Sequence, residues 1–240
     1  MRHYAYMALI VIISFILSLN TIKIFSLEEM SLFITVIGLI YGLIAAFTIN
    51  NAWERFSKIR DAVANETSSL TTLYILAKRL SDRTCTKKLK SVMLEYCNDV
   101  PKIDWKDYWK SDKIHKKFRS LMEIVADAKI RTEKDSVFID QITDELSAAT
   151  IARNQQLVLA QTRISGVQWL LNIFLSLILI MGLVFLNIPD YTLSVFVTAT
   201  MILAIMMIFV VIYELDSMKI SEEEVSNEPY RKLAKWVKEE

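Results

Sequence analysis

Residues 31–80 read SLFITVIGLIYGLIAAFTINNAWERFSKIRDAVANETSSLTTLYILAKRL, and this stretch decides the fold. Its first part, residues 31–52, is apolar over about 20 residues, which at a rise of 1.5 Å per residue cross a hydrocarbon core of ~30 Å. Its second part, residues 53–80, is charged and amphipathic, and neither Gly nor Pro stands between the two parts. Because nothing local ends the helix, we predict one long helix that leaves the membrane and continues into water.

Three further apolar segments predict membrane spans. They cover residues 4–19 (extendable to 25), 167–188 and 191–213. A connection of two residues, Pro189-Asp190, separates the last two segments. The chain is 53% hydrophobic with a mean hydropathy of +0.34, which is too apolar for an ordinary soluble domain. Together with residues 31–52, these segments predict four spans, so that both termini lie on one side of the membrane.

The distribution of charge predicts which side that is. Residues 51–165 hold 21 Lys and Arg against 16 Asp and Glu, an excess of five positive charges in a chain whose net charge is +1. The short loops on the other side hold Lys23 against Glu28, Glu29 and Asp190. Because basic loops stay in the cytoplasm, we expect a multi-pass protein of the cytoplasmic (inner) membrane with both termini inside.

The basic middle segment has helical periodicity. Apolar residues recur at three- and four-residue spacing in residues 63–80, 82–98, 118–128 and 133–163. This spacing is typical of helices that bury one face, and no strand pattern competes with it. We therefore predict an all-α membrane protein with four transmembrane helices and a helical cytoplasmic domain inserted between the second and the third. The expected boundaries are 1–52 for the first two spans, 53–166 for the cytoplasmic domain, 167–213 for the last two spans and 214–240 for a cytoplasmic tail.

The residues that carry metal, nucleotide or nucleic-acid chemistry are sparse. Cys85 and Cys97 stand with only His3 and His115, which are too few ligands for a metal site. All four glycines lie in or beside the apolar segments, so the soluble part has no Gly-rich phosphate loop. The lysines are interspersed with acids rather than gathered for nucleic acid. With no nucleophile–base pair visible, we expect no enzyme activity, no cofactor, no metal and no nucleic-acid partner.

A group of charged residues surrounds the point where the long helix leaves its apolar part. Trp53 precedes a basic run, as expected of an anchor at the cytoplasmic interface. Two interpretations apply to five of its members: an ion-pair network that joins the insert to the membrane helices or, for Arg55 and Arg60, surface anchors alone. These five are Arg55, Arg60, Glu66, Arg153 and Asp216, and Trp53 and Glu54 complete the group.

These residues also carry a family resemblance. Trp53-Glu54-Arg55-Phe56, with Arg60, Ala62-Val63 and Glu66, resembles the juxtamembrane signature of the bestrophin-like family of unknown function. Two further stretches are similar to motifs of that family: Ala152-Arg153 with Leu157 and Trp169, and Glu214-Leu215-Asp216 with Glu228-Pro229-Tyr230. The family has the same layout of two spans, a helical insert and two spans. This chain departs from it in two places, with Met218-Lys219 and Ser221 where the family has Pro-Phe and Gly, and with Asn154, Gln155 and Gln156 in place of charged neighbours of Arg153.

A more distant resemblance, to the bestrophins themselves, rests on the second span, where Gly42 precedes an apolar run. Bestrophins form homopentamers whose second helices line an ion pore with a narrow apolar neck. Carried over by position, the resemblance implies that Thr35, Leu39 and Leu43 face the axis. They are four residues apart and therefore share one helix face. Phe47 extends this stripe. The stripe has two interpretations: a gate that works by dewetting, or ordinary helix packing and lipid contact.

The resemblance implies a homo-oligomeric, pentameric ion channel that conducts anions such as chloride. Its partners are then the lipid bilayer, small ions and further copies of the chain. The basic insert favours anions because it concentrates them at the inner mouth. Two alternatives remain. Glu28 and Glu29, repeated around an oligomer, form a carboxylate ring that attracts cations, and a chain without a pore is a membrane adaptor whose helical insert binds a partner.

Overall fold

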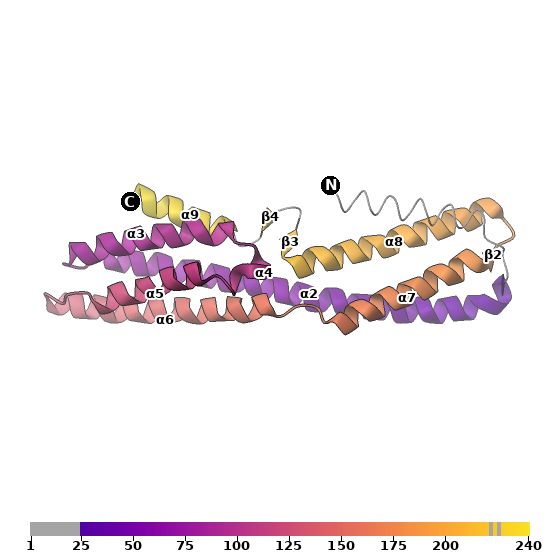
Figure 1. The fold of residues 1–240 in the computed structure, drawn as a ribbon, viewed down its shortest axis with the longest axis horizontal. Helices are drawn as coiled ribbons and strands as arrows, with labels where there is room; N and C mark the ends of the chain where they lie inside the picture. Colours follow the sequence, from indigo (N-terminus) through magenta and orange to yellow (C-terminus); the bar gives the residue numbers. More distant parts are fainter. Residues whose placement is uncertain (1–24, 221–222, 225–226) are drawn as a thin grey trace. The chain divides into compact units, whose positions relative to one another are not determined.

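The computed structural model describes residues 25–220, 223–224 and 227–240. The predicted first span, residues 4–19, lies outside them. The described part of the chain is almost entirely helical, which confirms the predicted all-α class (Figure 1). Its helices are α2 (Leu27–Ala77), α3 (Arg83–Asp99), the 3-10 helix η1 (Val100–Lys102), α4 (Trp105–Tyr108), α5 (Asp112–Ala126), α6 (Glu133–Gln161), α7 (Gly166–Phe185), α8 (Tyr191–Ser217) and α9 (Asn227–Glu239). Two short β pairs join parallel β1 (Phe25–Ser26) and β2 (Leu186–Asn187), and antiparallel β3 (Lys219–Ile220) and β4 (Glu223–Glu224).

Helix α2 is continuous over 51 residues, as predicted. It contains no Pro, and its threonines turn their hydroxyls back onto the helix backbone. Thr35 donates to the Ser31 carbonyl at 2.7 Å, and Thr48 donates to the Ile44 carbonyl at 2.9 Å. These bonds satisfy the hydroxyl donors within the helix. The polar residues of the apolar part therefore do not break it.

The chain folds as two compact units. The first, which we call the apolar unit, consists of Met1–Trp53 and Ile164–Asp216. In its described part, the first part of α2 packs against α7 and α8 around Tyr41, Ala45, Leu175, Leu179, Leu183 and Ile205. A Cβ on Gly182 would lie 3.3 Å from Ile34 Cγ1, so the glycine permits the close approach of α7 to α2. Three helices in the described residues are long and apolar enough to cross a membrane: Met30–Ala77, Gly166–Phe185 and Tyr191–Ser217.

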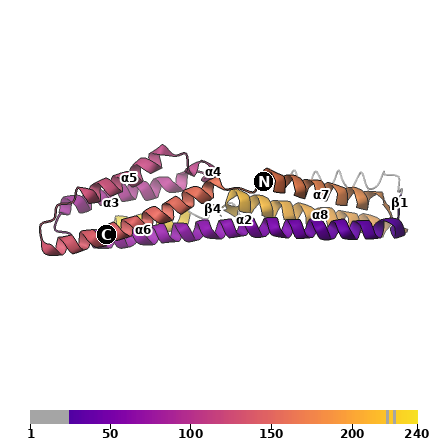
Figure 2. The same cartoon turned by 90° about the horizontal axis from the view of Figure 1, so that it is seen from below.

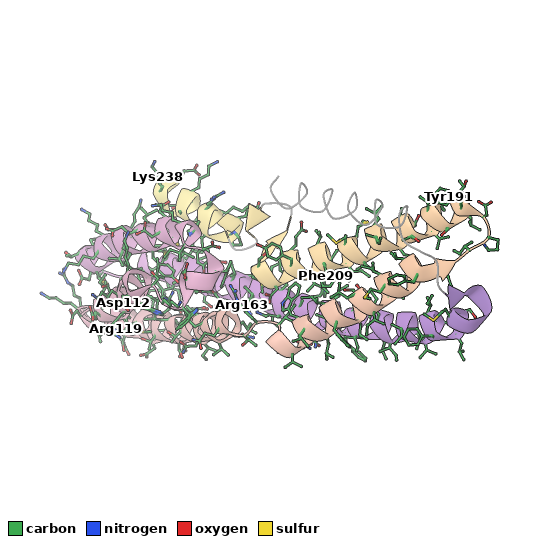
Figure 3. All side chains as sticks on the ribbon, turned by 45° about the vertical axis from the view of Figure 1, so that its right-hand side comes forward. Asp112, Arg119, Arg163, Tyr191, Phe209 and Lys238 are labelled. Atoms are coloured by element: carbon green, nitrogen blue, oxygen red, sulfur yellow. The ribbon has the colours of Figure 1, made fainter. Side chains whose placement is uncertain are left out.

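The second unit, which we call the charged unit, consists of Glu54–Arg163 and Ser217–Glu240. The second part of α2 packs here with α3, α5, α6 and α9, and α3 lies against α5 (Figure 2). Its core includes Leu70, Leu73, Leu89, Met93, Ile114 and Leu121. Figure 3 shows polar side-chain atoms gathered on the unit that holds Asp112, Arg119 and Lys238, whereas carbon dominates around Phe209. The assignment of the two units to membrane and cytoplasm stays a prediction.

Two helices of the charged unit come from segments that the sequence patterns left without structure. Polar residues 102–117 contain α4 and the first turns of α5, and Trp105, Tyr108 and Ile114 are buried there. The predicted tail contains α9, which buries Tyr230, Leu233 and Val237. Their three- and four-residue spacing is the period of an amphipathic helix. The tail is therefore part of the core of the charged unit.

Candidate functional site

The predicted pore stripe lies on an uncovered face of α2 in the apolar unit. Leu39, Leu43 and Phe47 are 70%, 55% and 61% exposed, and Thr35 is exposed as well. The opposite face of the helix, with Tyr41, Ala45 and Thr48, is buried. The four predicted side chains thus share one face, and none of them belongs to the core that α2 forms with α7 and α8.

Exposure alone does not distinguish this stripe from a surface in contact with lipid. α7 and α8 also present large exposed apolar residues, among them Phe174, Leu177, Met181, Phe196, Leu203 and Met207. The α2 face differs in how it continues. Residues seven apart on a helix drift by only about 20°, so Phe47 is followed on the same face by Glu54, Asp61 and Ser68, all exposed. One helix face therefore changes from apolar to hydrophilic along its length.

Thr48 and the two asparagines that follow have different surroundings. The Asn172 amide donates to Thr48 Oγ1 at 3.0 Å and to the Gln168 carbonyl at 2.8 Å, which ties α7 to α2 inside the apolar unit. Asn50 and Asn51 are exposed at the end of the apolar part of α2. Thr48 therefore acts as a packing residue, and the asparagines are available to water.

A buried carboxylate, Glu66, is the centre of a second cluster in the charged unit. Its side chain is fully buried on α2. It accepts hydrogen bonds from the Tyr96 hydroxyl at 2.5 Å, from Gln156 Nε2 at 2.6 Å and from the Tyr230 hydroxyl at 2.8 Å. These donors come from α3, α6 and α9. One carboxylate thus joins four helices.

Arg153 of α6 is the cationic counterpart of Glu66 in this cluster. Its Nη1 donates to the hydroxyls of Tyr96 and Tyr108, the latter at 3.2 Å, and its Nη2 lies 3.3 Å from His115 Nδ1. The guanidinium also lies over the ring of Phe118, 4.8 Å from the centroid. The Tyr96 hydroxyl therefore accepts from Arg153 and donates to Glu66. It bridges two opposite charges that are both removed from water.

The electrostatics of this cluster are those of a buried, compensated pair. Burial raises the pKa of the Glu66 carboxyl, while the charge of Arg153 and three hydrogen bonds act against that rise. Burial also raises the pKa values of Tyr96 and Tyr230, so both hydroxyls stay protonated and donate. Burial lowers the pKa of Arg153, but the neighbouring Tyr96, Tyr108 and Glu66 raise it overall, so the guanidinium keeps its charge.

The other predicted juxtamembrane residues make further contacts. Arg55 is buried, and its Nε donates to the Leu159 carbonyl at 2.9 Å, which links α2 to α6. Glu54 pairs with Lys58 at 2.7 Å on the surface. Trp53 and Arg60 are exposed, and the Asp216 carboxylate accepts from the Ile164 backbone N–H at 3.1 Å within the apolar unit. Within the predicted set, Glu66 and Arg153 meet through the Tyr96 hydroxyl.

The sequence patterns did not identify most partners of this pair. The periodicity of residues 82–98 places Tyr96 only on an apolar helix face, no helix was predicted around Tyr108, and His115 was considered only in excluding a metal site. Gln156 carried a signal, because it lies one turn after Arg153 on α6 and so shares its face. In the described residues, no group of three His, Cys, Asp or Glu is arranged to hold a metal ion.

Comparisons with known proteins agree with this arrangement of helices. Crystal structures of a bacterial bestrophin homolog from Klebsiella pneumoniae, each with a single substitution, superpose on the chain with TM-scores of 0.76, 0.75 and 0.74. Sequence identity is 11%, 11% and 12%, and the matches cover 99%, 98% and 100% of this chain and 99%, 97% and 98% of the others. At this identity the likeness shows the fold alone. No curated protein matches the sequence.

A family model shows to which family the chain belongs, which structures of such low sequence identity cannot show. The model of the bestrophin-like domain matches residues 29–217, which include α7, α8, all of α2 but its first two residues, and the helical segment between them. This is well over half of the chain, and it contains the stripe on α2 together with Glu66 and Arg153. The protein therefore belongs to the bestrophin-like family.

Proposed function

We propose that this protein is a homo-oligomeric ion channel of the cytoplasmic membrane, with a pore lined by α2. The observation that carries the proposal is the uncovered face of α2, which is apolar from Leu39 to Phe47 and hydrophilic from Glu54 to Ser68. A helix that lines a pore needs a narrow section and then a section that water can fill.

The proposed topology has four spans, with residues 4–19 as the first, both termini in the cytoplasm and the charged unit inside. In such an assembly Thr35, Leu39, Leu43 and Phe47 point to the axis. Apolar rings resist conduction because a passing ion loses hydration without gaining protein oxygens in return. The neck formed by Leu39, Leu43 and Phe47 is then the gate, and family membership supports this role by analogy only.

Two selectivities are supported by different features. The excess of basic residues in the charged unit favours anions such as chloride, as expected from the sequence. The face of α2 favours cations, because Asp61 follows the neck on the side proposed to face the axis, where Glu54 is already paired with Lys58. Charges at the pore lie close to a passing ion. Salt screens the diffuse basic excess beyond about 8–10 Å, so that excess has less influence on the ion. We therefore favour a cation-conducting channel over an anion-conducting one of the same architecture.

The decisive measurement is electrical. The purified protein, imaged to establish its symmetry, is placed in planar bilayers with a KCl gradient, and the reversal potential is read. A cation channel follows the potassium equilibrium potential and an anion channel follows the chloride potential. Asp61→Asn should move the reversal potential toward that of chloride, while Asp112→Asn, an exposed carboxylate on α5, should leave it unchanged. A symmetric particle that does not conduct would instead make the protein a membrane adaptor.

A further inference from the structure

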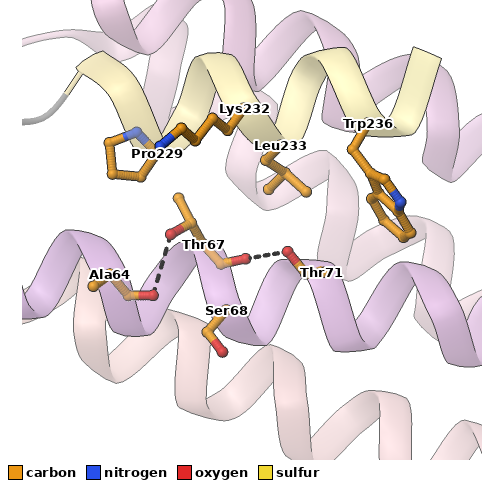
Figure 4. A pocket seen from close by; sticks show the side chains of 8 residues that line it. All are labelled: Ala64, Thr67, Ser68, Thr71, Pro229, Lys232, Leu233 and Trp236. Atoms are coloured by element: carbon orange, nitrogen blue, oxygen red, sulfur yellow. Dashed lines mark hydrogen bonds between the residues drawn. The ribbon is translucent and has the colours of Figure 1, made fainter. Parts of the chain in front are cut away.

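The cluster around Glu66 and Arg153 reaches the surface of the charged unit at His115 of α5, which is partly exposed. Its other hydrogen-bonded members are buried: Glu66, Tyr96, Tyr108, Arg153, Gln156 and Tyr230. A groove of about 360 Å³ between α2 and α9 contains none of these residues, and side chains such as those of Thr67, Pro229 and Trp236 line it instead (Figure 4). A proton from water therefore meets the cluster first at His115.

The two partners of the His115 ring determine which of its nitrogens carries a hydrogen. Nε2 lies 3.2 Å from the Trp109 carbonyl oxygen, which can only accept, and Nδ1 lies 3.3 Å from Arg153 Nη2, which can only donate. Both hydrogen bonds form together only when Nε2 carries a hydrogen and Nδ1 presents its lone pair. The positions of the partners therefore fit the neutral imidazole with its hydrogen on Nε2.

A proton on His115 would turn its contact with Arg153 into a repulsion. Both ring nitrogens of an imidazolium donate, so the new N–H at Nδ1 would point at a guanidinium N–H, and two positive charges would lie side by side. The guanidinium cannot withdraw into water because Arg153 is buried, and an arginine does not release its charge in a protein. The start of α5, which carries the partly exposed His115, is therefore the part that gives way.

The other charges around His115 do not compensate for this repulsion. On α5 itself, Asp112 and Arg119 lie one turn before and one turn after His115, carry opposite charges and are exposed, as is Lys116. The remaining titratable groups of the cluster are Tyr108 of α4, Tyr96 of α3, Tyr230 of α9 and Glu66 of α2. Burial raises the pKa values of the three tyrosines, so they stay protonated, and it raises the pKa of Glu66 as well. Glu66 is therefore the group from which an acid response of His115 has to be distinguished.

We propose that His115 is an acid-sensitive latch of the charged unit. The neutral ring holds the start of α5 to α6 through Arg153, and uptake of a proton releases that contact. The segment that loosens is residues 103–115, which form the four-residue helix α4 and the first turn of α5. Histidine suits this role because it is the side chain that ordinarily changes its charge between pH 5 and pH 8. The inference concerns the charged unit alone and holds whether or not the protein conducts ions.

Hydrogen exchange of the full chain in detergent, followed by mass spectrometry, measures this release. As the pH falls, the backbone amides of residues 103–115 should exchange faster in wild type than in His115→Gln, because glutamine keeps an acceptor for Arg153 and takes up no proton. An exposed histidine titrates at about pH 6.5, so the ratio of the two rates should rise from about 1 at pH 7.5 to about 10 at pH 5.5. Comparison of the two proteins at the same pH removes the intrinsic pH dependence of exchange.

Two controls accompany this measurement. Residues 133–146, the first half of α6, should keep a ratio near 1 at both pH values, because the latch does not hold them. His3→Gln removes the only other histidine of the chain and should keep the acid response of wild type.

Magnetic resonance of the imidazole tests the latch without the glutamine variant. In His3→Gln with isotope-labelled histidine, His115 gives the only imidazole signal. At pH 8 its ring carbon and nitrogen shifts should be those of the neutral ring with hydrogen on Nε2. On acidification, the midpoint of proton uptake should coincide with the midpoint of the faster exchange in residues 103–115.

Three results would overturn the proposal. Equal acceleration of exchange in wild type and in His115→Gln would assign the acid response to another group, first of all Glu66. A neutral ring with its hydrogen on Nδ1 at pH 8 would exclude the contact with Arg153. A ring that takes up its proton without faster exchange, or that takes up none down to pH 5, would make His115 a structural residue and not a latch.

Discussion

The Tyr96 hydroxyl shows how a single residue holds the charged unit together. It connects Arg153 to Glu66, and each of these charges has further partners from other helices. Buried opposite charges of this kind are strongly interdependent, because removal of one leaves the other desolvated and unpaired. The cluster is therefore more sensitive to substitution than its number of hydrogen bonds suggests.

Glu66→Gln tests this dependence. The amide cannot accept from all three donors, and the charge of Arg153 loses its counterpart, so the free energy of unfolding should fall by roughly 3–5 kcal/mol. Chemical denaturation in detergent, followed by circular dichroism, measures the change. Glu95→Gln is the control, since it breaks a surface pair with Lys117 and should cost about 1 kcal/mol or less. Equal losses of unfolding free energy in the two variants would show that the buried pair contributes no more to stability than a surface pair.

Leu43 tests the proposed neck. Leu43 is 55% exposed and lies outside the core of the apolar unit, so Leu43→Ala leaves no cavity within the subunit. We expect a wider, more hydrated neck and a larger current or open fraction, and Leu43→Ser should act more strongly because its hydroxyl offers an oxygen. Single-channel recording in planar bilayers measures both.

Two leucines serve as controls for Leu43. Leu32 lies near the N-terminal end of the same helix and is 73% exposed, and Leu203 is a 49% exposed leucine of α8. Their alanine variants should conduct as wild type. If Leu43→Ala instead weakened the oligomer without any gain of current, Leu43 would be a packing residue between subunits.

At the scale of elements, a side chain that caps one helix also holds a connection far away in the sequence. Asp135 lies in the first turn of α6, where it forms a capping box with Thr132. Its carboxylate also accepts from the backbone N–H of Ser81, at 2.9 Å, and from that of Arg131, at 3.1 Å. The same group thus caps α6 and anchors the connection between α2 and α3.

This arrangement predicts a dependence on acid. Backbone hydrogen bonds, that of Ser81 first, lower the pKa of Asp135 to about 2, whereas an unfolded Asp titrates at about 3.9. A lowered pKa means that the carboxylate stabilises the fold above about pH 4, and that this stability is lost as the pH falls toward 2. Melting temperatures between pH 6 and pH 2.5 should fall less steeply for Asp135→Asn than for wild type. If the melting temperatures of the two proteins fell in parallel with pH, Asp135 would not contribute to the acid sensitivity of the fold.

At the scale of the whole molecule, the topology connects every other proposal. Cys85 and Cys97 are buried and so do not report on sidedness. In intact cells, a membrane-impermeant maleimide should label Glu28→Cys and should not label Lys87→Cys, which is exposed on α3. Permeabilised cells should give label in both. Labelling of Lys87→Cys from outside would place the charged unit outside and contradict the orientation inferred from the positive-inside rule.

The long helix and the two later apolar helices follow from the sequence because their causes are local. Hydropathy over about 20 residues and the absence of Pro between residues 31 and 77 act within a few turns of chain. The same local reasoning placed Thr35, Leu39, Leu43 and Phe47 on one face, and the structure puts all four on an exposed face. Whether that face lines a pore stays a prediction, because it depends on neighbours outside a single chain.

Only the tertiary structure decided what surrounds Glu66 and Arg153. Glu66 meets Tyr96 across 30 residues and Tyr230 across 164 residues of sequence, and no periodicity encodes contacts over such separations. The sequence predicted only a cytoplasmic tail for residues 214–240, whereas in the structure Tyr230, Leu233 and Val237 bury one side of α9. The helix period shows that one face of a helix will be covered. Which surface covers it is decided by the packing of the whole unit. In that packing, buried polar groups must find hydrogen-bond partners that lie far away in the chain.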